Sequence, residues 1–191
     1  MAGDLGTRRS EVHDETRTVL DFWFGLPPEK RFAKDDALDA EIARRFGPLR
    51  DRLLATGAEG WRDAPDALLA AIIVLDQFSR NIHRGGPQAY QADALALELT
   101  RHGIVEGWEG RYPPERRAFL YMPLMHAEDP DVQRLSLDRF TALGEPENLR
   151  YAREHADVIA EYGRFPSRNA ALNRETTSAE RDYLSRPGAG W

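Results

Sequence analysis

The stretch Leu68-Leu69-Ala70-Ala71-Ile72-Ile73-Val74-Leu75-Asp76-Gln77-Phe78-Ser79-Arg80-Asn81-Ile82-His83-Arg84-Gly85 decides the fold. It passes from an unbroken apolar run directly into polar and charged residues. The run Ile72 to Leu75 alone would suit a buried strand, but the length of the pattern and the flanking alanines favour a helix. We predict one central helix over about residues 65–84, ended by Gly85-Gly86-Pro87. Because the run is apolar on all sides, neighbouring elements should cover it all round.

The rest of the chain carries helical periodicity between short proline- and glycine-containing loops. No segment alternates with period two, and no hairpin turn sequence appears. We therefore predict an all-α fold of about eight or nine antiparallel packed helices in a single domain, residues 10–191, after a flexible N-terminal tail, residues 1–9. The expected helices, besides the central one, run from after Ser10 to about Phe24, from about Asp35 to Ala55, from Gly86-Pro87 to about His102, from Pro113-Pro114 through Leu124, from Asp129-Pro130 to near Gly144, from Pro146 to Tyr162 and from Thr177 to Leu184.

Two helix features carry specific expectations. Gly47-Pro48 should bend or split the helix that begins near Asp35, because proline lacks the backbone N–H. Asp63 should cap the central helix, with Pro65 in its first turn.

The composition excludes several classes of protein. The net charge is −6, which argues against a nucleic-acid partner. There is no cysteine, which excludes disulfides, thiolate catalysis and zinc–thiolate sites. The N-terminus lacks an apolar secretory segment, and the longest apolar run is too short to cross a bilayer, so we expect no membrane partner and a cytoplasmic location.

Polar residues gather at the end of the central helix. Asp76, Arg80 and Arg84 are spaced i, i+4 and i+8, so they share one helix stripe. Asp76 follows the buried run, and a buried carboxylate is costly unless it is paired. A structural Asp76–Arg80 ion pair, with Arg84 answering the helix dipole, is one interpretation; a ligand site is the other.

A second segment, Gly163-Arg164-Phe165-Pro166-Ser167-Arg168-Asn169, echoes Phe78-Ser79-Arg80-Asn81. It lies in a turn between helices, and Ser167 is placed to cap a short helix after it. Arginine beside a helix N-terminus is a ready environment for an anion. The structural alternative is that Arg164 and Arg168 bind carbonyls at helix C-termini.

A third segment runs from Tyr121 to Asp129. Pro123 makes the helix irregular, and His126 falls on its inward stripe. An inward histidine is either a satisfied core residue or a candidate base, and Glu128 orients it only if the backbone turns there. Familiar catalytic signatures are absent. His126 and His155 could meet in space, but their spacing predicts no metal site, and no cofactor is predicted.

These three segments, together with Val19-Leu20-Asp21-Phe22-Trp23-Phe24-Gly25, resemble the hallmark motifs of a bacterial family catalogued as domain of unknown function 924. The resemblance runs from about Val19 to the end of the chain. It implies an all-helical fold similar to the tetratricopeptide-like superfamily, and it implies no activity and no catalytic residue. The chain departs from the family pattern at Ser79, where proline is usual, and at Ser167, where histidine is frequent.

Three functional hypotheses follow. The first is a pocket for an anionic small molecule or a peptide carboxylate. Arg84, Arg164 and Arg168 lie beside apolar residues and have no acid within a helical turn, so an anion would relieve the cost of their partial burial. We also expect the two Arg-Asn segments to face each other. The second is an enzyme with acid–base chemistry at His126, with Glu128 or Asp76 as partner. The third is a protein-interaction scaffold whose motifs are purely structural. The ligand-binding candidates under the first hypothesis are Arg80, Asn81, Arg84, Arg164, Arg168 and Asn169.

Overall fold

The computed structural model describes residues 2–190, with side chains from residue 10 onward. The all-α prediction is confirmed: helices make up 73% of the structure, and the described residues form no strand. Since α4, η1 and α5 form one continuous rod, these residues contain nine packed α-helical units. The expected likeness to tetratricopeptide-like arrays stays a prediction.

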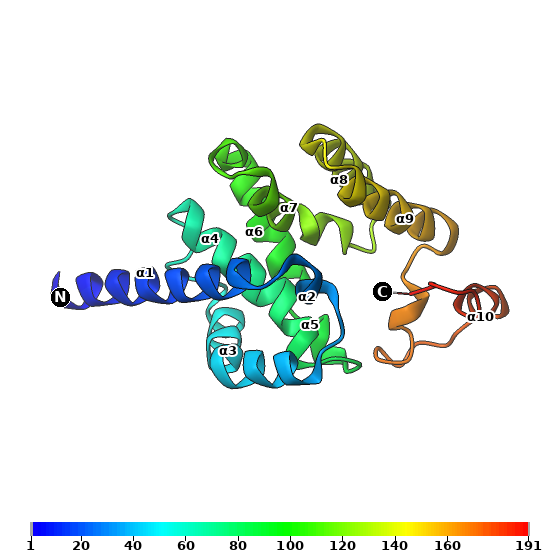
Figure 1. Cartoon of the computed structure of the whole chain (residues 1–191), viewed down its shortest axis with the longest axis horizontal. Helices are drawn as coiled ribbons and strands as arrows, with labels where there is room; N and C mark the ends of the chain where they lie inside the picture. Colours follow the sequence, from blue (N-terminus) through cyan, green and yellow to red (C-terminus); the bar gives the residue numbers. More distant parts are fainter. Residues whose placement is uncertain (1, 191) are drawn as a thin grey trace.

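Figure 1 shows how the helices are arranged, with the rod in the middle of the molecule. The α-helices are α1 (Ala2–Gly25), α2 (Pro28–Phe32), α3 (Asp36–Thr56), α4 (Pro65–Ile72), α5 (Ser79–Ile82), α6 (Asp93–Val105), α7 (Pro114–Met125), α8 (Pro130–Leu143), α9 (Pro146–Tyr162) and α10 (Ser178–Leu184). The π-helix is η1 (Ile73–Phe78), and the short 3₁₀-helices are η2 (Pro87–Ala89), η3 (Trp108–Arg111) and η4 (Pro166–Arg168).

The rod is the core of the molecule. Every residue from Leu68 to Leu75 is at most 1% exposed. The rod is covered by α1, α3, α6 and α7, which all contact it. This enclosure confirms the central helix and its expected all-round cover, and burial of each large aliphatic side chain contributes about 1.5–3 kcal/mol.

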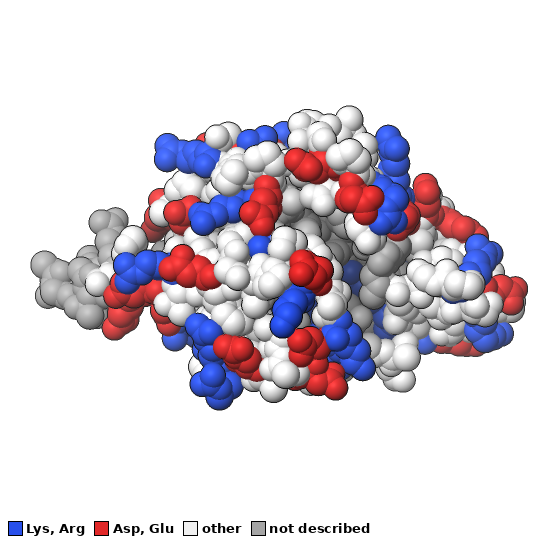
Figure 2. Space-filling model, in the orientation of Figure 1, with Lys and Arg blue, Asp and Glu red and all other residues white. Residues whose placement is uncertain are grey.

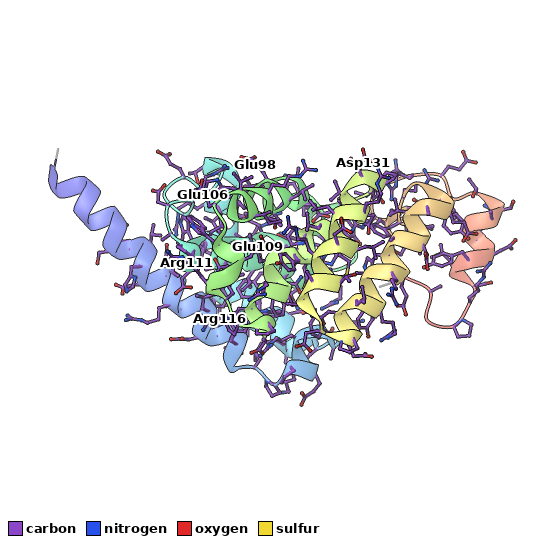
Figure 3. The ribbon with its side chains drawn as sticks, turned by 90° about the horizontal axis from the view of Figure 1, so that it is seen from above. Glu98, Glu106, Glu109, Arg111, Arg116 and Asp131 are labelled. Carbon is purple, nitrogen blue, oxygen red and sulfur yellow. The ribbon has the colours of Figure 1, made fainter. Side chains whose placement is uncertain are left out.

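The C-terminal half of the chain extends the core sideways. α8 packs against α7 and α9, and Figure 3 shows α8 and α9 side by side. Glu109 of η3, labelled in Figure 3, ties this layer to the centre, because Tyr121 Oη donates to it at 2.6 Å and Arg139 Nη1 at 3.1 Å. α10 and η4 lie at the far end of the molecule (Figure 1), and α10 starts with a capping box between Thr177 and Glu180.

Several helix boundaries differ from the expected ones. α1 begins at Ala2 instead of after Ser10; the side chains of residues 1–9 lie outside the described part, and the division into tail and domain stays a prediction. The N-cap of α4 is Ala64 and makes no side-chain hydrogen bond, so the expected Asp63 cap was wrong. α3 is not split and runs through Pro48. One missing hydrogen bond is outweighed there by burial of four large apolar side chains on both sides of the proline, namely Ile42, Phe46, Leu49 and Leu53.

The helix expected from Gly86-Pro87 is the largest departure. Only η2 forms there, and α6 starts at Asp93. Arg50 Nη2 donates to the carbonyl oxygen of Gln88 at 3.0 Å and to Gln91 Oε1 at 3.2 Å. The Gln88 carbonyl oxygen, which would accept a backbone hydrogen bond inside a longer helix, accepts one from Arg50 instead. As a result, Asp93 lies at the N-terminal end of a helix.

No helix within residues 2–190 combines the length and the apolar character needed to cross a membrane.

Candidate functional site

A π-helical segment places the first functional side chains. In η1 the backbone hydrogen bonds reach one residue further than in an α-helix, and such segments are frequent at functional sites. η1 carries Asp76 and Gln77 out of the apolar run while both stay buried, at 1% and 9% exposure. The sequence predicted a helix here but not its π-helical geometry.

Asp76 is surrounded by donors from two helices and a turn. Its Oδ1 lies 2.7 Å from His126 Nδ1 and 3.1 Å from Arg80 Nη1, and its Oδ2 accepts from Gln77 Nε2 at 2.5 Å. The expected Asp76–Arg80 ion pair is therefore confirmed. Burial raises the pKa of Asp76, but Arg80, His126 and Gln77 outweigh it and hold this pKa below its usual range. Asp76 is thus ionised at neutral pH.

Two arginines from distant segments share one carboxylate. Arg80 Nη1 and Nη2 donate to the two oxygens of Asp93 at 3.0 and 3.1 Å, and Arg168 Nη1 donates to Asp93 Oδ2 at 3.2 Å. Arg168 Nη2 also donates to the carbonyl oxygen of His126 at 2.9 Å. Arg80 and Arg168 are therefore adjacent, as the facing-segment hypothesis required.

Arg168 is the less fully compensated of the two cations. Its guanidinium lies over the rings of Tyr90 and Phe165, with centroids at 4.7 and 4.5 Å. Burial, and next the neighbouring charge of Arg80, lower the pKa of Arg168. A second anion near this side chain would be favourable.

His126 is neutral at pH 7. Burial lowers its pKa, and Asp76 only partly opposes this effect. The His155 ring lies 6.0 Å away, centroid to centroid, so the two histidines meet as the sequence allowed. Burial and the proximity of His126 lower the pKa of His155 to about 3.

The three polar segments noted in the sequence converge on one place. The first segment contacts the third through Asp76 and His126, and the second contacts the third through Arg168 and the His126 carbonyl. Figure 2 shows basic and acidic side chains interspersed over the face drawn there. The side chains of Arg80, Asp93 and His126 are each 15–22% exposed, so the cluster is partly open.

A bacterial protein family of unknown function, DUF924, matches residues 19–188. The chain belongs to this family. The chain is also similar to a solved structure of a protein of unknown function, ATU0120 from Agrobacterium tumefaciens, with 36% identity and a TM-score of 0.85. That match covers 89% of this chain and 96% of the other. No curated protein matches the chain.

Some candidate residues of this DUF924 chain lie outside the central cluster. Arg84 binds Asp39 with Nε–Oδ2 and Nη2–Oδ1 distances of 2.6 and 2.9 Å, and Asn81 Nδ2 donates to the same carboxylate at 2.8 Å. Glu180 accepts from Arg164 Nε at 2.6 Å and from Asn169 Nδ2 at 3.3 Å. In each of these two groups a protein carboxylate already binds the arginine and the asparagine, as in a structural ion pair.

Arg84, Arg164 and Arg168 have no acid nearby in the sequence, as expected, but the fold gives each a carboxylate partner, so none of them depends on an outside anion for pairing. Their partners are Asp39, Glu180 and Asp93, which lie 45, 16 and 75 residues away in the chain. Only the fold brings them together, so no local spacing could reveal them.

Two further expectations for the second and third segments changed. Ser167 does not cap a helix, because η4 starts one residue earlier with Phe165 at its N-cap. Glu128 does not orient His126; it accepts from Arg174 Nη1 at 2.7 Å and from the Phe165 backbone N–H at 2.7 Å. Among the described residues, Asp76 is the carboxylate that hydrogen-bonds to His126.

Sequence reasoning missed Asp93 and Tyr90. Asp93 was hidden inside the helix expected from residue 86, where an acid is ordinary. The available signal was the turn before it, which contains Gln88 and Gln91; both accept hydrogen bonds from Arg50.

Proposed function

We propose that this DUF924 protein is an enzyme that binds a small anionic substrate with Arg80 and Arg168 and transfers a proton with His126. The hydrogen bond of 2.7 Å between Asp76 and His126, beside two paired arginines, is the observation that carries the proposal. It joins two hypotheses, anion binding and acid–base chemistry, at one cluster.

The Asp76–His126 contact supports a defined role for the imidazole. Because Asp76 is ionised, it accepts, so His126 Nδ1 carries the proton and Nε2 is left with a lone pair. A carboxylate that orients histidine in this way is the arrangement used in general-base catalysis. A lowered pKa also keeps His126 in the unprotonated form that a base requires.

The arginines support an anionic substrate. Guanidinium groups bind carboxylates and phosphates with planar, paired hydrogen bonds. A small carboxylate, a phosphate monoester and the carboxylate of a peptide end share this chemistry. In hydrolysis, His126 Nε2 would take a proton from water as the oxygen attacks, and would then give it to the leaving group. In isomerisation, it would take and return a proton on a substrate carbon.

A second candidate is the interaction scaffold with purely structural motifs. It is favoured by one observation: Arg80, Arg84, Arg164 and Arg168 all have carboxylate partners within the protein. A closed ion-pair network has no need of a ligand. The two candidates differ in whether the cluster responds to an added anion.

The test is imidazole ¹⁵N NMR of His126 during titration with inorganic phosphate and with acetate, at constant ionic strength. We expect the Nδ1–H tautomer, and we expect the anion to raise the His126 pKa, since a nearby negative charge favours imidazolium. Asp76→Asn should remove the tautomer bias and lower this pKa further. Arg168→Met should abolish the response to the anion, and the matched control Glu128→Gln should change neither result.

An Nε2–H tautomer, or a His126 signal that ignores both anions, would favour the scaffold. Any hydrolytic or isomerising activity found with carboxylate or phosphate compounds should fall by about 10²–10⁴-fold in His126→Gln. That substitution keeps a neutral polar side chain but removes the titrating group.

A further inference from the structure

Asp93 holds the two arginines in the way a bound anion would. Its carboxylate accepts three hydrogen bonds, two from Arg80 and one from Arg168, at 3.0–3.2 Å. Both of its oxygens are engaged by Arg80, which is the bidentate geometry of arginine–carboxylate recognition. The arginines are thus already arranged for a carboxylate, and the carboxylate is the protein's own.

Asp93 is also placed so that it can leave. It is the first residue of α6, and its side chain is 20% exposed. The N-terminal end of a helix carries partial positive charge, so a carboxylate that moves off the arginines remains stabilised there and by water. Asp76, the other acid of the cluster, is 1% exposed and has no such alternative.

The charges of the cluster balance only while Asp93 is in place. Arg80 and Arg168 contribute two positive charges, Asp76 and Asp93 contribute two negative charges, and His126 is neutral. When Asp93 moves away, the cluster carries one net positive charge. One carboxylate or phosphate group from outside restores the balance.

We propose that Asp93 is an internal competitor for the substrate's anionic group, and that a small carboxylate or phosphate compound binds by displacing it from Arg80 and Arg168. This inference rests on the proposed function, since it concerns the same arginines. Asp93 is then a specificity-determining residue: it weakens the binding of simple anions, so that only ligands with additional contacts occupy the site at low concentration.

The experiment compares phosphate binding by wild type, Asp93→Asn and Asp39→Asn. Inorganic phosphate is titrated by calorimetry and by thermal melting, with sodium chloride as the matched-ionic-strength control. Asp39→Asn is the matched control, because it also removes a carboxylate from an arginine, Arg84, but outside the cluster. Asparagine keeps the shape of the side chain and removes its charge.

We expect Asp93→Asn to bind phosphate at least about tenfold more tightly than wild type. The substitution removes a negative charge a few ångströms from the bound anion, and near a protein surface the repulsion between two such charges exceeds the free energy of a tenfold change in affinity. Asp39→Asn should bind like wild type. The double variant Asp93→Asn/Arg168→Met should lose the gain. If Asp93→Asn folds poorly, phosphate should restore its folded yield and melting temperature, and chloride should not.

Equal phosphate affinity in Asp93→Asn and wild type would overturn the inference, as would a gain that survives Arg168→Met. Recovery of an unstable Asp93→Asn by chloride and phosphate alike, or by neither, would also overturn it. The proposed function fails separately, when His126 in wild type ignores every anion even at saturating concentration. A wild-type His126 response without a gain in Asp93→Asn would therefore leave the proposed function standing and remove only the competitor role.

Discussion

The two halves of the central rod both contain buried residues, but these residues differ in their chemistry. Residues from Leu68 to Leu75 are apolar, and each is at most 1% exposed. In the next turns Asp76, Ser79 and Asn81 are only 1%, 0% and 8% exposed, yet they are polar. The first half contacts apolar side chains of four helices, whereas the second half meets acids, an imidazole and an arginine from distant segments. Burial alone therefore does not say what a residue is for.

The two halves differ in the free energy of burying their side chains. Apolar burial stabilises the fold in proportion to area, and many apolar side chains would serve equally well. A buried ion pair is expensive, and replacing it with apolar side chains is often neutral or stabilising. Asp76 and Arg80 thus occupy positions where stability alone would be satisfied by leucine, which is a physical argument for a function in the second half.

The apolar half should fail completely when charged. Ile73→Asp would place an unpaired carboxylate in a fully enclosed position, and we expect no soluble folded protein. The measurement is soluble yield with far-ultraviolet circular dichroism and thermal melting. Val105→Asp, at an apolar position that is 82% exposed, is the control and should melt like wild type. A soluble Ile73→Asp protein with an unchanged melting temperature would show that the rod is not essential to the fold.

The two halves also differed in how well the sequence predicted them. Residue pattern was enough for the apolar half, because hydrophobic periodicity reports burial directly, and residues 65–82 form the expected rod. Its π-helical segment was not predicted, since i→i+5 bonding leaves no mark that distinguishes it from an α-helix in one sequence. The boundary at Asp93 was missed because the cause, Arg50 holding the Gln88 carbonyl, lies 38 residues away.

The cluster was predicted in part for the same reason. The sequence led us to expect that the segments of Arg80 and Arg168 face each other, and it offered Asp76 as one of two partners for His126; the structure shows both contacts. Arg84 and Arg164 carry the same local signal but pair with Asp39 and Glu180. Local sequence reveals which arginines need a partner, and only the tertiary fold decides which partner each receives.

The two histidines beside the polar half, His126 and His155, should make the fold sensitive to acid. His155 and His126 have lowered pKa values in the folded state, His155 to about 3, so below pH ~6.5 the unfolded chain binds protons that the folded chain does not. The free energy of unfolding should therefore fall as pH decreases from ~6.5 toward ~3, with His155 contributing at most on the order of 5 kcal/mol. Asp76, whose folded pKa is also lowered, loses its contribution only at still lower pH, in the same direction.

Urea unfolding at several pH values from 3 to 8 measures this slope. His155→Gln should flatten it between pH ~3 and ~6.5, because glutamine does not titrate. The control is Val105→Ala, a non-titrating change at a position that is 82% exposed, which should leave the slope as it is. A slope that is the same in wild type and His155→Gln would show that this histidine is not held neutral by the fold.

The smallest effect is expected where the polar half reaches solvent. Arg84 is 39% exposed and pairs with Asp39, which keeps a hydrogen bond from Asn81 when the arginine is removed. Exposed ion pairs contribute about 0–1 kcal/mol, so Arg84→Met should lower the free energy of unfolding by less than ~1 kcal/mol. Arg80→Met, four residues earlier in the chain, leaves Asp76 buried without its cation and should cost about 3–5 kcal/mol. Urea unfolding of both variants at pH 7 measures this difference in the free energy of unfolding. Phosphate titration is a second measurement: Arg84→Met should bind phosphate like wild type, whereas Arg80→Met should not bind it. Similar losses of stability in the two variants would mean that Arg84 is as deeply engaged as Arg80, and the boundary between structural tie and functional cluster would then lie beyond the end of α5.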